Sequence, residues 1–285
     1  MRALLCGINA RNIHASPALY SLIRYAQEHD PGCRLQLREY ALHTPTQHIL
    51  ADIYDAHPDL LGFSMYIWNA GFISQLLSDL RKLLPQTRII LGGPEASCRA
   101  EYYLHKLPVD AICIGEGEES FTALLQALKG QEAGAELPVV KGFLLKDNEA
   151  AYMPVSEPDL DRLPFLYDEA TAAMLGRKHK LVYYESSRGC PYFCSFCASA
   201  RSRLRERSLD KVMEELPKLA EIGGQVKFID RTFNASRKRA LAISQRILEL
   251  ARPGLSWHFE VSPFGLCREL VDLWNSAPAG YLHLE

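Results

Sequence analysis

The chain has 285 residues and a formal net charge of −2, with 48% hydrophobic and 23% charged residues. At roughly 100–200 residues per domain, this length predicts two globular domains with sizeable cores. This charge balance excludes a strongly basic surface that would attract nucleic acids or membranes. No segment approaches the length of about 18 consecutive apolar residues that a membrane span requires. The first residues do not resemble a signal peptide, so we expect a cytoplasmic protein with no membrane partner.

Strands and helices alternate over residues 1–130. Strands are expected at 2–8, 34–42, 60–67, 87–93 and 111–117, and helices at 16–29, 45–57, 71–85 and 118–130. Repeated strand–helix units form parallel sheets with right-handed crossovers. Five such strands with ligand loops at their carboxyl ends predict a flavodoxin-like, doubly wound α/β domain.

The alternation breaks over residues 131–180, which we interpret as a hairpin and linker. Residues 139–155 carry two apolar runs around the polar sequence KDNEA, a pattern typical of a hairpin. Residues 156–169 are rich in Pro and Asp, which favours a surface connector.

The strand–helix pattern returns over residues 181–285. Strands are expected at 181–187, 225–234, 256–263 and 280–285, separated by helices at 208–224, 236–254 and 267–277. This order predicts a (βα) barrel that stops at about its fourth strand. An open half-barrel leaves the edge of its last strand unpaired. We therefore expect that the chain is truncated, and that any activity of the barrel depends on further barrel strands.

Three of the eight cysteines, Cys190, Cys194 and Cys197, lie in the stretch ESSRGCPYFCSFC (185–197). A disulfide framework does not fit a cytoplasmic chain. The C-x3-C-x2-C spacing is also unlike the paired C-x2-C units of structural zinc sites, and no second pair follows. Three thiolates can hold a four-iron cluster that keeps one iron open. A zinc knuckle or a redox-labile loop is the alternative interpretation.

This loop directly follows the first barrel strand and has Phe196 before its last cysteine, and it resembles that of the radical S-adenosylmethionine (SAM) enzymes. The resemblance implies a [4Fe–4S] cluster on the three cysteines, whose open iron chelates SAM and whose reduced form cleaves it to a 5′-deoxyadenosyl radical. It also implies an electron donor such as flavodoxin or ferredoxin. The implied SAM contacts are Phe196, Asp230, Glu260 and Ser262, although the chain lacks the Gly-Gly-Glu segment usual near Asp230.

The segments YYESSRGCP (183–191) and IDRTFN (229–234) resemble an uncharacterised family of cobalamin-binding radical SAM proteins. The resemblance implies that the first domain binds cobalamin at its strand ends. The candidate contacts are Asn9, Ala10, Arg11, Ser64, Met65, Tyr66, Gly92, Gly93, Pro94, Gly115, Glu116, Gly117 and Glu118. The D-x-H-x-x-G motif that supplies a histidine to cobalt is absent, so we expect no histidine ligand and apolar residues over that face of the macrocycle. The alternative is a domain that binds nothing, or only substrate.

The resemblance implies a cobalamin-dependent radical SAM methyltransferase that acts on an unactivated carbon of an unknown small-molecule, peptide or RNA substrate. Two alternatives stay open. One is a radical SAM enzyme with another outcome, such as methylthio transfer, rearrangement or ring formation. The other is a non-catalytic corrinoid or iron–sulfur carrier.

The sequence RSRLRERS (201–208) places four arginines just beyond the cysteines: Arg201, Arg203, Arg205 and Arg207. They could contact an anion or RNA beside the site. The simpler interpretation is a solvated approach to the next helix, with the arginines paired to Asp210, Glu214 and Glu215.

Overall fold

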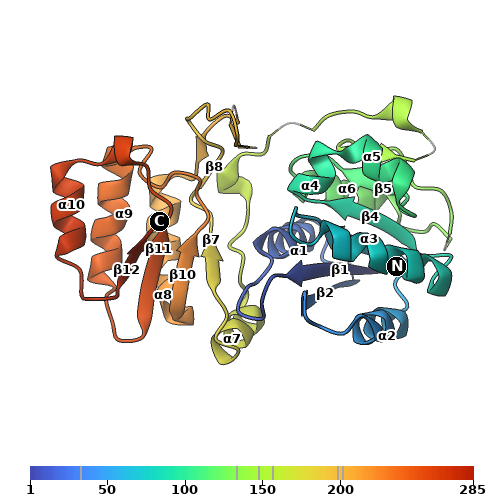
Figure 1. Ribbon diagram of the computed structural model, residues 1–285, viewed down its shortest axis with the longest axis horizontal. Coiled ribbons are helices and arrows are strands. Elements are labelled where there is room, and N and C mark those ends of the chain that lie inside the picture. The colour runs from blue at the N-terminus through green and yellow to red at the C-terminus, as the bar shows by residue number, and fades with distance from the viewer. Residues whose placement is uncertain (33, 133, 147, 156, 198, 201) are drawn as a thin grey trace. The chain divides into compact units, whose positions relative to one another are not determined.

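The computed structural model describes residues 1–32, 34–132, 134–146, 148–155, 157–197, 199–200 and 202–285. The chain divides into two compact units, Met1–Pro158 and Asp159–Glu285 (Figure 1). Within the described ranges, no helix combines the length and the apolar character of a bilayer-spanning segment.

The first unit is built on a six-stranded sheet with the order β2-β1-β3-β4-β5-β6. Its strands are β1 (Arg2–Asn9), β2 (Arg34–Ala41), β3 (Leu60–Ser64), β4 (Arg88–Gly92), β5 (Ala111–Cys113) and β6 (Phe143–Leu145). The first five strands are parallel, and β6 pairs antiparallel with β5. The order 2-1-3-4-5 is the flavodoxin-like order, so the predicted doubly wound sheet is confirmed.

Helices cover both faces of this sheet (Figure 1). One face packs against α1 (Pro17–His29) and α6 (Glu118–Ala127); the other packs against α2 (Thr46–Ala56), α3 (Ala70–Leu83), α4 (Pro94–Cys98) and α5 (Ala100–Lys106). All of β3 is buried, as expected for a parallel strand covered on both faces. The sequence analysis did not predict α4 and α5, because helices of five and seven residues are too short to show a clear helical period.

The segment after α6 differs from the predicted hairpin and linker. Among its described residues, only β6 is a strand, and the 3₁₀ turn η1 (Glu149–Ala151) follows it. The strand pairs with β5 instead of with a second hairpin arm. Phe143 and Leu145 are buried in the core between the sheet and helices α1 and α6, so this segment belongs to the first unit. The division between the units therefore falls at Pro158 instead of near residue 130.

The second unit contains a four-stranded parallel sheet with the sequential order β7-β10-β11-β12. Its strands are β7 (Val182–Tyr184), β10 (Gly224–Phe228), β11 (Leu255–Phe259) and β12 (Leu282–Leu284). The connecting helices are α8 (Leu209–Ile222), α9 (Arg237–Glu249) and α10 (Arg268–Asn275), and η2 (Leu160–Arg162) and α7 (Glu169–Arg177) precede the sheet. Sequential parallel strands joined by helices are the arrangement of a (βα) barrel, which confirms the predicted fold class.

Aromatic side chains form the core between this sheet and its helices. The Phe228 ring lies 5.2 Å from the Tyr184 ring and 5.0 Å from the Phe259 ring. Buried Trp257 donates a hydrogen bond of 2.9 Å from Nε1 to the Tyr281 hydroxyl, which in turn donates to the Ile247 carbonyl of α9. The buried Trp274 Nε1 likewise donates to the Ser244 hydroxyl at 2.9 Å. With both indole N–H groups satisfied, this core gives the loops at the strand ends a rigid support.

Candidate functional site

The three clustered cysteines lie in a loop whose base is closed by a short antiparallel pair. Strands β8 (Ser187–Arg188) and β9 (Arg205–Glu206) pair Ser187 with Glu206 and Arg188 with Arg205. We call residues 189–204 between them the cluster loop. Gly189 begins it with φ of 93°, and a Cβ at this position would overlap the carbonyl oxygen of Arg203. Only glycine combines that backbone angle with so close an approach.

The cysteines of the cluster loop are free thiols. Cys190 is half-buried, whereas Cys194 and Cys197 are exposed. The Cys197 N–H donates to the Cys194 carbonyl at 3.2 Å, which forms a turn between them. Among the described residues, no three Cys, His, Asp or Glu side chains are grouped closely enough to hold a metal ion. The structure therefore does not bring the three sulfurs together.

The chemistry of this donor set nevertheless fits a [4Fe–4S] cluster. Three accessible thiols from one loop can supply three thiolates and leave one iron without a protein ligand. A structural zinc site usually takes four protein ligands, and this loop offers only three. Cys190, Cys194 and Cys197 would hold the cluster, as expected from their spacing.

Asp230 lies in the turn after β10 and is buried. Its Oδ1 accepts a hydrogen bond of 2.8 Å from the Ser186 N–H, and its Oδ2 accepts from the hydroxyls of Ser186 and Ser187 at 2.6 and 2.7 Å. Burial raises the pKa of this carboxyl to about 6, and the hydrogen bonds only partly oppose the rise. The carboxylate of Asp230 is thus occupied with the residues that lead into the cluster loop, and its expected contact with SAM stays a prediction.

The other three expected SAM contacts lie at or near the carboxyl ends of the strands. Phe196 is 90% exposed in the cluster loop. Glu260 and Ser262 follow β11; the Glu260 Oε1 lies 3.6 Å from the Lys227 Nζ, and the Ser262 Oγ accepts from the Phe264 N–H. Parallel strands end at one edge of their sheet, so β7, β10 and β11 bring these loops to the same edge, where barrel enzymes bind substrate. Contact with SAM itself stays a prediction.

The arginine run divides between buried and exposed positions, with Arg201 outside the described residues. Arg207 is buried: its Nη1 lies 3.7 Å from the Glu215 Oε1 and also donates to the Leu163 carbonyl. Its Nε donates to the Glu185 carbonyl. Pairing with Glu215 was expected, but Arg207 is not solvated; it ties the chain just after β9 to α8.

In the first unit, the expected cobalamin contacts follow β1, β3, β4 and β5, which are neighbours in the sheet. The strand order reverses between β1 and β3, the usual place for a ligand in such sheets. Asn9 fixes the loop after β1: its Nδ2 donates to the His14 carbonyl at 3.2 Å, and its Oδ1 accepts from the Ser16 hydroxyl at 2.9 Å. Ala10 and Arg11 are exposed in this loop.

The loop after β3 presents aromatic side chains at this edge. The rings of Tyr66 and Trp68 stack 4.3 Å apart; Trp68 is 53% exposed, and Ile67 is 81% exposed. Asn69, which is buried, holds the loop: its Nδ2 donates to the carbonyls of Ile8 and Ser64, and its Oδ1 accepts from the Tyr66 N–H. Exposed large apolar groups that are held rigidly are typical of a binding surface.

The remaining expected contacts divide into open and buried positions. Gly93 has φ of 97°, and a Cβ there would lie 2.7 Å from the Met65 carbonyl oxygen. Gly115 has open space at its Cβ position. The side chains of Met65 and Glu118 are buried, and Glu118 accepts a hydrogen bond from the Ser21 hydroxyl. Gly92 ends β4, Pro94 begins α4, and Glu116 and Gly117 follow β5; their contact with cobalamin stays a prediction.

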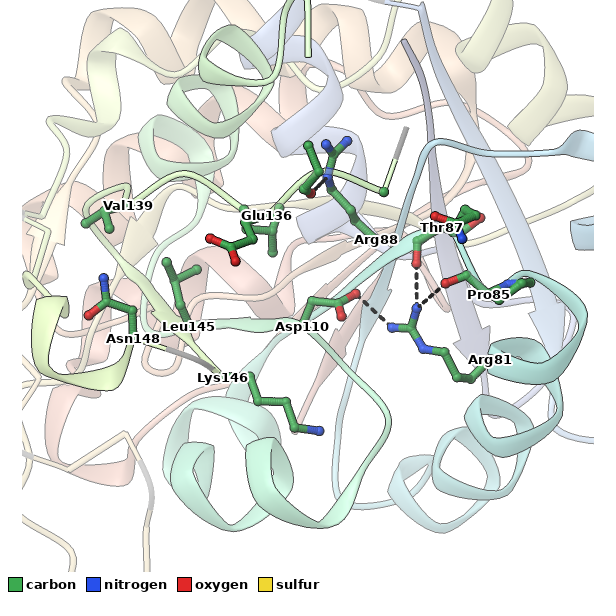
Figure 2. A pocket seen from close by; sticks show the side chains of 14 residues that line it. Arg81, Pro85, Thr87, Arg88, Asp110, Glu136, Val139, Leu145, Lys146 and Asn148 are labelled. Atoms are coloured by element: carbon green, nitrogen blue, oxygen red, sulfur yellow. Dashed lines mark hydrogen bonds and ion pairs between the residues drawn. The ribbon is translucent and has the colours of Figure 1, made fainter. Parts of the chain in front are cut away.

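A cavity of about 460 Å³ lies at the opposite edge of the first sheet (Figure 2). Two arginines that line it are hydrogen-bonded within the protein. Arg81 donates to Asp110 at 2.8 Å, and Arg88 donates to the Ala135 carbonyl at 2.7 Å. Arg88 begins β4, so the cavity lies at the amino end of the strands. It is therefore separate from the loops expected to bind cobalamin.

Sequence reasoning missed three residues that organise these loops. Asn69 could have been noticed as an Asn at the start of a helix that follows a strand-end loop. Thr232 lies within the IDRTFN segment, and its Oγ1 is 3.7 Å from the Cys190 Sγ. Arg239 of α9 donates to the carbonyls of Ser186 and Arg207, and no local pattern in the sequence indicates this.

Comparison with known proteins agrees with this geometry. Residues 4–125 match the B12-binding domain family. The chain is 30% identical over 67% of its length to an uncharacterised methyltransferase of Pyrococcus horikoshii, PH0819, and 29% identical over 60% to the cobalamin-dependent radical SAM methyltransferase TokK of Streptomyces tokunonensis. It covers 43% and 27% of those proteins, so it spans less than half the length of these curated relatives.

Among solved structures, the cobalamin-dependent SAM radical enzyme OxsB, with aqua-cobalamin and SAM bound, matches with a TM-score of 0.76. The match covers 99% of this chain and 43% of that one, at 17% sequence identity, so it supports the fold. These matches confirm the resemblance recognised from the sequence, which is to cobalamin-binding radical SAM proteins.

Proposed function

We propose that the chain provides the cofactor sites of a cobalamin-dependent radical SAM methyltransferase that acts on an unactivated carbon. One observation carries this proposal: the chain joins a B12-binding domain at residues 4–125 to a three-cysteine loop that follows the first strand of a (βα) barrel. The curated relatives named as methyltransferases support the reaction class.

The cluster loop is suited to hold an iron–sulfur cluster at the edge of its sheet. When bound, the cluster with SAM supplies a carbon-centred radical, and cobalamin supplies a transferable methyl group. The protein contributes the position and the shielding. Cys190 is half-buried, whereas Cys194 and Cys197 are exposed, so the loop would present two of its three thiols to an incoming cluster.

The first unit offers cobalamin a surface of backbone and aromatic groups. Gly115 leaves open space for close approach to the backbone, and the Tyr66–Trp68 stack offers a flat apolar face. No D-x-H-x-x-G motif is present in the sequence. We therefore propose that this loop covers one face of the macrocycle without a histidine ligand to cobalt.

The substrate and the electron donor belong to the proposal as well. A reduced cluster requires a one-electron donor, for which a flavodoxin or a ferredoxin is suited. The substrate is a small molecule, a peptide or an RNA with an unactivated carbon. The cytoplasmic location expected from the sequence is also part of this proposal.

The test is anaerobic reconstitution of the chain with iron, sulfide and cobalamin, followed by desalting and an ultraviolet–visible spectrum. We then expect corrinoid absorption together with iron–sulfur absorption. Incubation with SAM and a reductant should release 5′-deoxyadenosine, as well as S-adenosylhomocysteine from methylation of the corrinoid. Cys190→Ala should retain the corrinoid and release no 5′-deoxyadenosine.

The alternatives give different results. Release of 5′-deoxyadenosine without retained corrinoid would contradict the methyltransferase and favour another radical SAM outcome. Bound cofactor without 5′-deoxyadenosine, in this chain and in the longer relative PH0819 treated alike, would favour a carrier.

A further inference from the structure

The 229–234 segment, IDRTFN, follows β10 and reaches the loops on both sides of that strand. We infer that it is a positioning element, which sets the cluster loop through Asp230 and Thr232 and the loop after β11 through Asn234. The inference rests on the proposed function, because it takes Cys190 as a cluster ligand. It assigns the segment to the support of the cofactor site, in place of a direct contact between Asp230 and SAM.

On the β7 side, the segment fixes the residues that open and close the cluster loop. The three hydrogen bonds that Asp230 accepts from Ser186 and Ser187 are 2.6–2.8 Å long, and all these residues are buried. The Ser186 carbonyl accepts from the Arg207 N–H at 2.9 Å, so the start and the end of the loop base are joined. Arg239 donates to the carbonyls of both Ser186 and Arg207, which adds a second clamp from α9.

On the β11 side, Asn234 makes the equivalent connection. Its side chain is fully buried, its Nδ2 donates to the Ser262 carbonyl at 2.7 Å, and its Oδ1 accepts from the Ser262 N–H at 2.8 Å. The neighbouring Phe233 N–H donates to the Glu260 carbonyl at 2.8 Å. One short segment therefore fixes the backbone at Glu260 and Ser262 as well as the cluster loop.

Between these two anchors, Thr232 brings a hydroxyl to a cysteine sulfur. Its hydroxyl donates a hydrogen bond of 2.8 Å to the Arg231 carbonyl, its Oγ1 lies 3.7 Å from the Cys190 Sγ, and the residue is buried. The hydroxyl has one proton, so a hydrogen bond to a Cys190 thiolate would replace the one to the Arg231 carbonyl. Hydrogen bonds to the sulfurs of an iron–sulfur cluster are one of the factors that set its reduction potential. Thr232 is thus placed to act on the cluster through its ligand Cys190.

The first experiment compares the reduction potential and the electron paramagnetic resonance spectrum of the reconstituted cluster in wild type, Thr232→Val and Thr232→Ser. Valine keeps the shape and removes the hydroxyl, whereas serine keeps the hydroxyl. We expect full iron content in all three, a more negative potential and an altered spectrum in Thr232→Val, and values close to wild type in Thr232→Ser. A wild-type potential and spectrum in Thr232→Val would overturn the role of Thr232.

The second experiment tests the anchor at Asp230 and needs no cofactor. Amide hydrogen exchange of the protein before reconstitution should show at least tenfold faster exchange over residues 186–190 and 202–207 in Asp230→Ala, with partial recovery in Asp230→Asn. Asp161→Ala is the matched control, because Asp161 also accepts from a serine backbone N–H, that of Ser208, but lies outside the loop. The control should leave exchange at 186–190 unchanged.

Iron content distinguishes failure of the positioning role from failure of the proposed function. After reconstitution, Asp230→Ala should hold less than half the iron of wild type, while Asp161→Ala should hold the full amount. A wild-type protein that takes up no cluster contradicts the proposed function. A wild-type protein with a full cluster, together with unchanged exchange and iron in Asp230→Ala, contradicts the positioning role alone.

Discussion

Asp230 is subject to two opposing effects. Burial disfavours its charge, whereas hydrogen bonds from two serines favour it. Both of its oxygens accept hydrogen bonds from residues that lead into the cluster loop. A carboxylate with these partners influences the cofactor site by holding the backbone that leads into the cluster loop. Its raised pKa should appear in the pH dependence of the free energy of unfolding.

Asp230 should make the folded state less stable as the pH rises. Burial raises its pKa from 3.8 to about 6, so the folded protein holds this proton more tightly than the unfolded chain does. The extra stability is present below about pH 4 and is lost as the pH rises through about 6. Relative to Asp230→Asn, the free energy of unfolding of wild type should fall by about 3 kcal/mol over this range.

Denaturant unfolding at a series of pH values measures this difference. Asp161→Asn is a control of opposite sign. Burial raises the pKa of Asp161, but the hydrogen bonds of Ser208 and the charges of Lys211 and Arg207 outweigh this and lower it. Its contribution should therefore be present above the ordinary pKa and be lost as the pH falls. A difference between wild type and Asp230→Asn that does not change with pH would refute the raised pKa.

Gly189 should be intolerant of any side chain. Alanine there would force a non-glycine residue to φ of 93° and place its Cβ on the Arg203 carbonyl. We expect Gly189→Ala to open the β8–β9 pair, at a cost of roughly 1–3 kcal/mol of backbone strain, and to lose most of its iron on reconstitution. Gly224→Ala is the control that distinguishes the effect of the Cβ overlap from the effect of the positive φ. Its φ is also positive, at 73°, but its Cβ position is open. Equal iron content in both variants would contradict this account.

At the scale of elements, α8 is joined to the cluster loop through a buried ionic network. Glu215 accepts from the Tyr184 hydroxyl at 2.6 Å and pairs with Arg207. Burial, together with the charge and the hydrogen bond of Glu215, raises the pKa of Tyr184. The network connects the first barrel strand, the end of the cluster loop and the next helix.

Glu215→Ala should be strongly destabilising, because it leaves the Arg207 charge buried without its partner. The expected loss is about 3–5 kcal/mol in the free energy of unfolding, measured with denaturant. Glu214→Ala is the matched control, because the Glu214 carboxylate forms an exposed ion pair with Lys218. The free energy of unfolding of this variant should show no measurable change. A similar small effect for both would show that the buried pair contributes little.

The loop between β3 and α3 should determine cobalamin affinity. Removing one ring of the Tyr66–Trp68 stack in Trp68→Ala should weaken cobalamin binding about tenfold, since an aromatic contact is worth roughly 0.5–1.5 kcal/mol. Titration followed by corrinoid absorption measures this change. Tyr102→Ala, which removes an exposed aromatic ring on α5, should bind like wild type. Wild-type affinity in Trp68→Ala would place cobalamin elsewhere.

Much of the fold was predictable, because each long element carries a strong local pattern. The buried strand β3 and the amphipathic helix α3 are examples. The segments α4, α5 and β6 were not, because short elements depend on tertiary partners such as the pairing of β6 with β5. The three-cysteine loop was recognisable from its spacing, and its assignment as the cluster ligands stays a prediction. The partners of Asp230 and Arg239 were not predictable, because these hydrogen bonds join residues more than 30 positions apart.

At the scale of the whole molecule, the residues expected to bind cobalamin and those expected to hold the iron–sulfur cluster lie in different compact units. The match to the B12-binding domain family lies within Met1–Pro158, and the three cysteines lie within Asp159–Glu285. Each expected site is built from loops at the carboxyl ends of parallel strands in one unit. Loss of one cofactor should therefore leave binding of the other intact.

The most direct test of the proposed cofactor sites is the iron, sulfide and corrinoid content of the anaerobically reconstituted chain and of its Cys190→Ala, Cys194→Ala and Cys197→Ala variants. For wild type we expect about four iron and four sulfide ions and about one corrinoid per chain. Each variant should lose the intact cluster and keep the corrinoid. A full cluster in Cys190→Ala, or a wild-type chain that binds neither cofactor, would contradict the assignment.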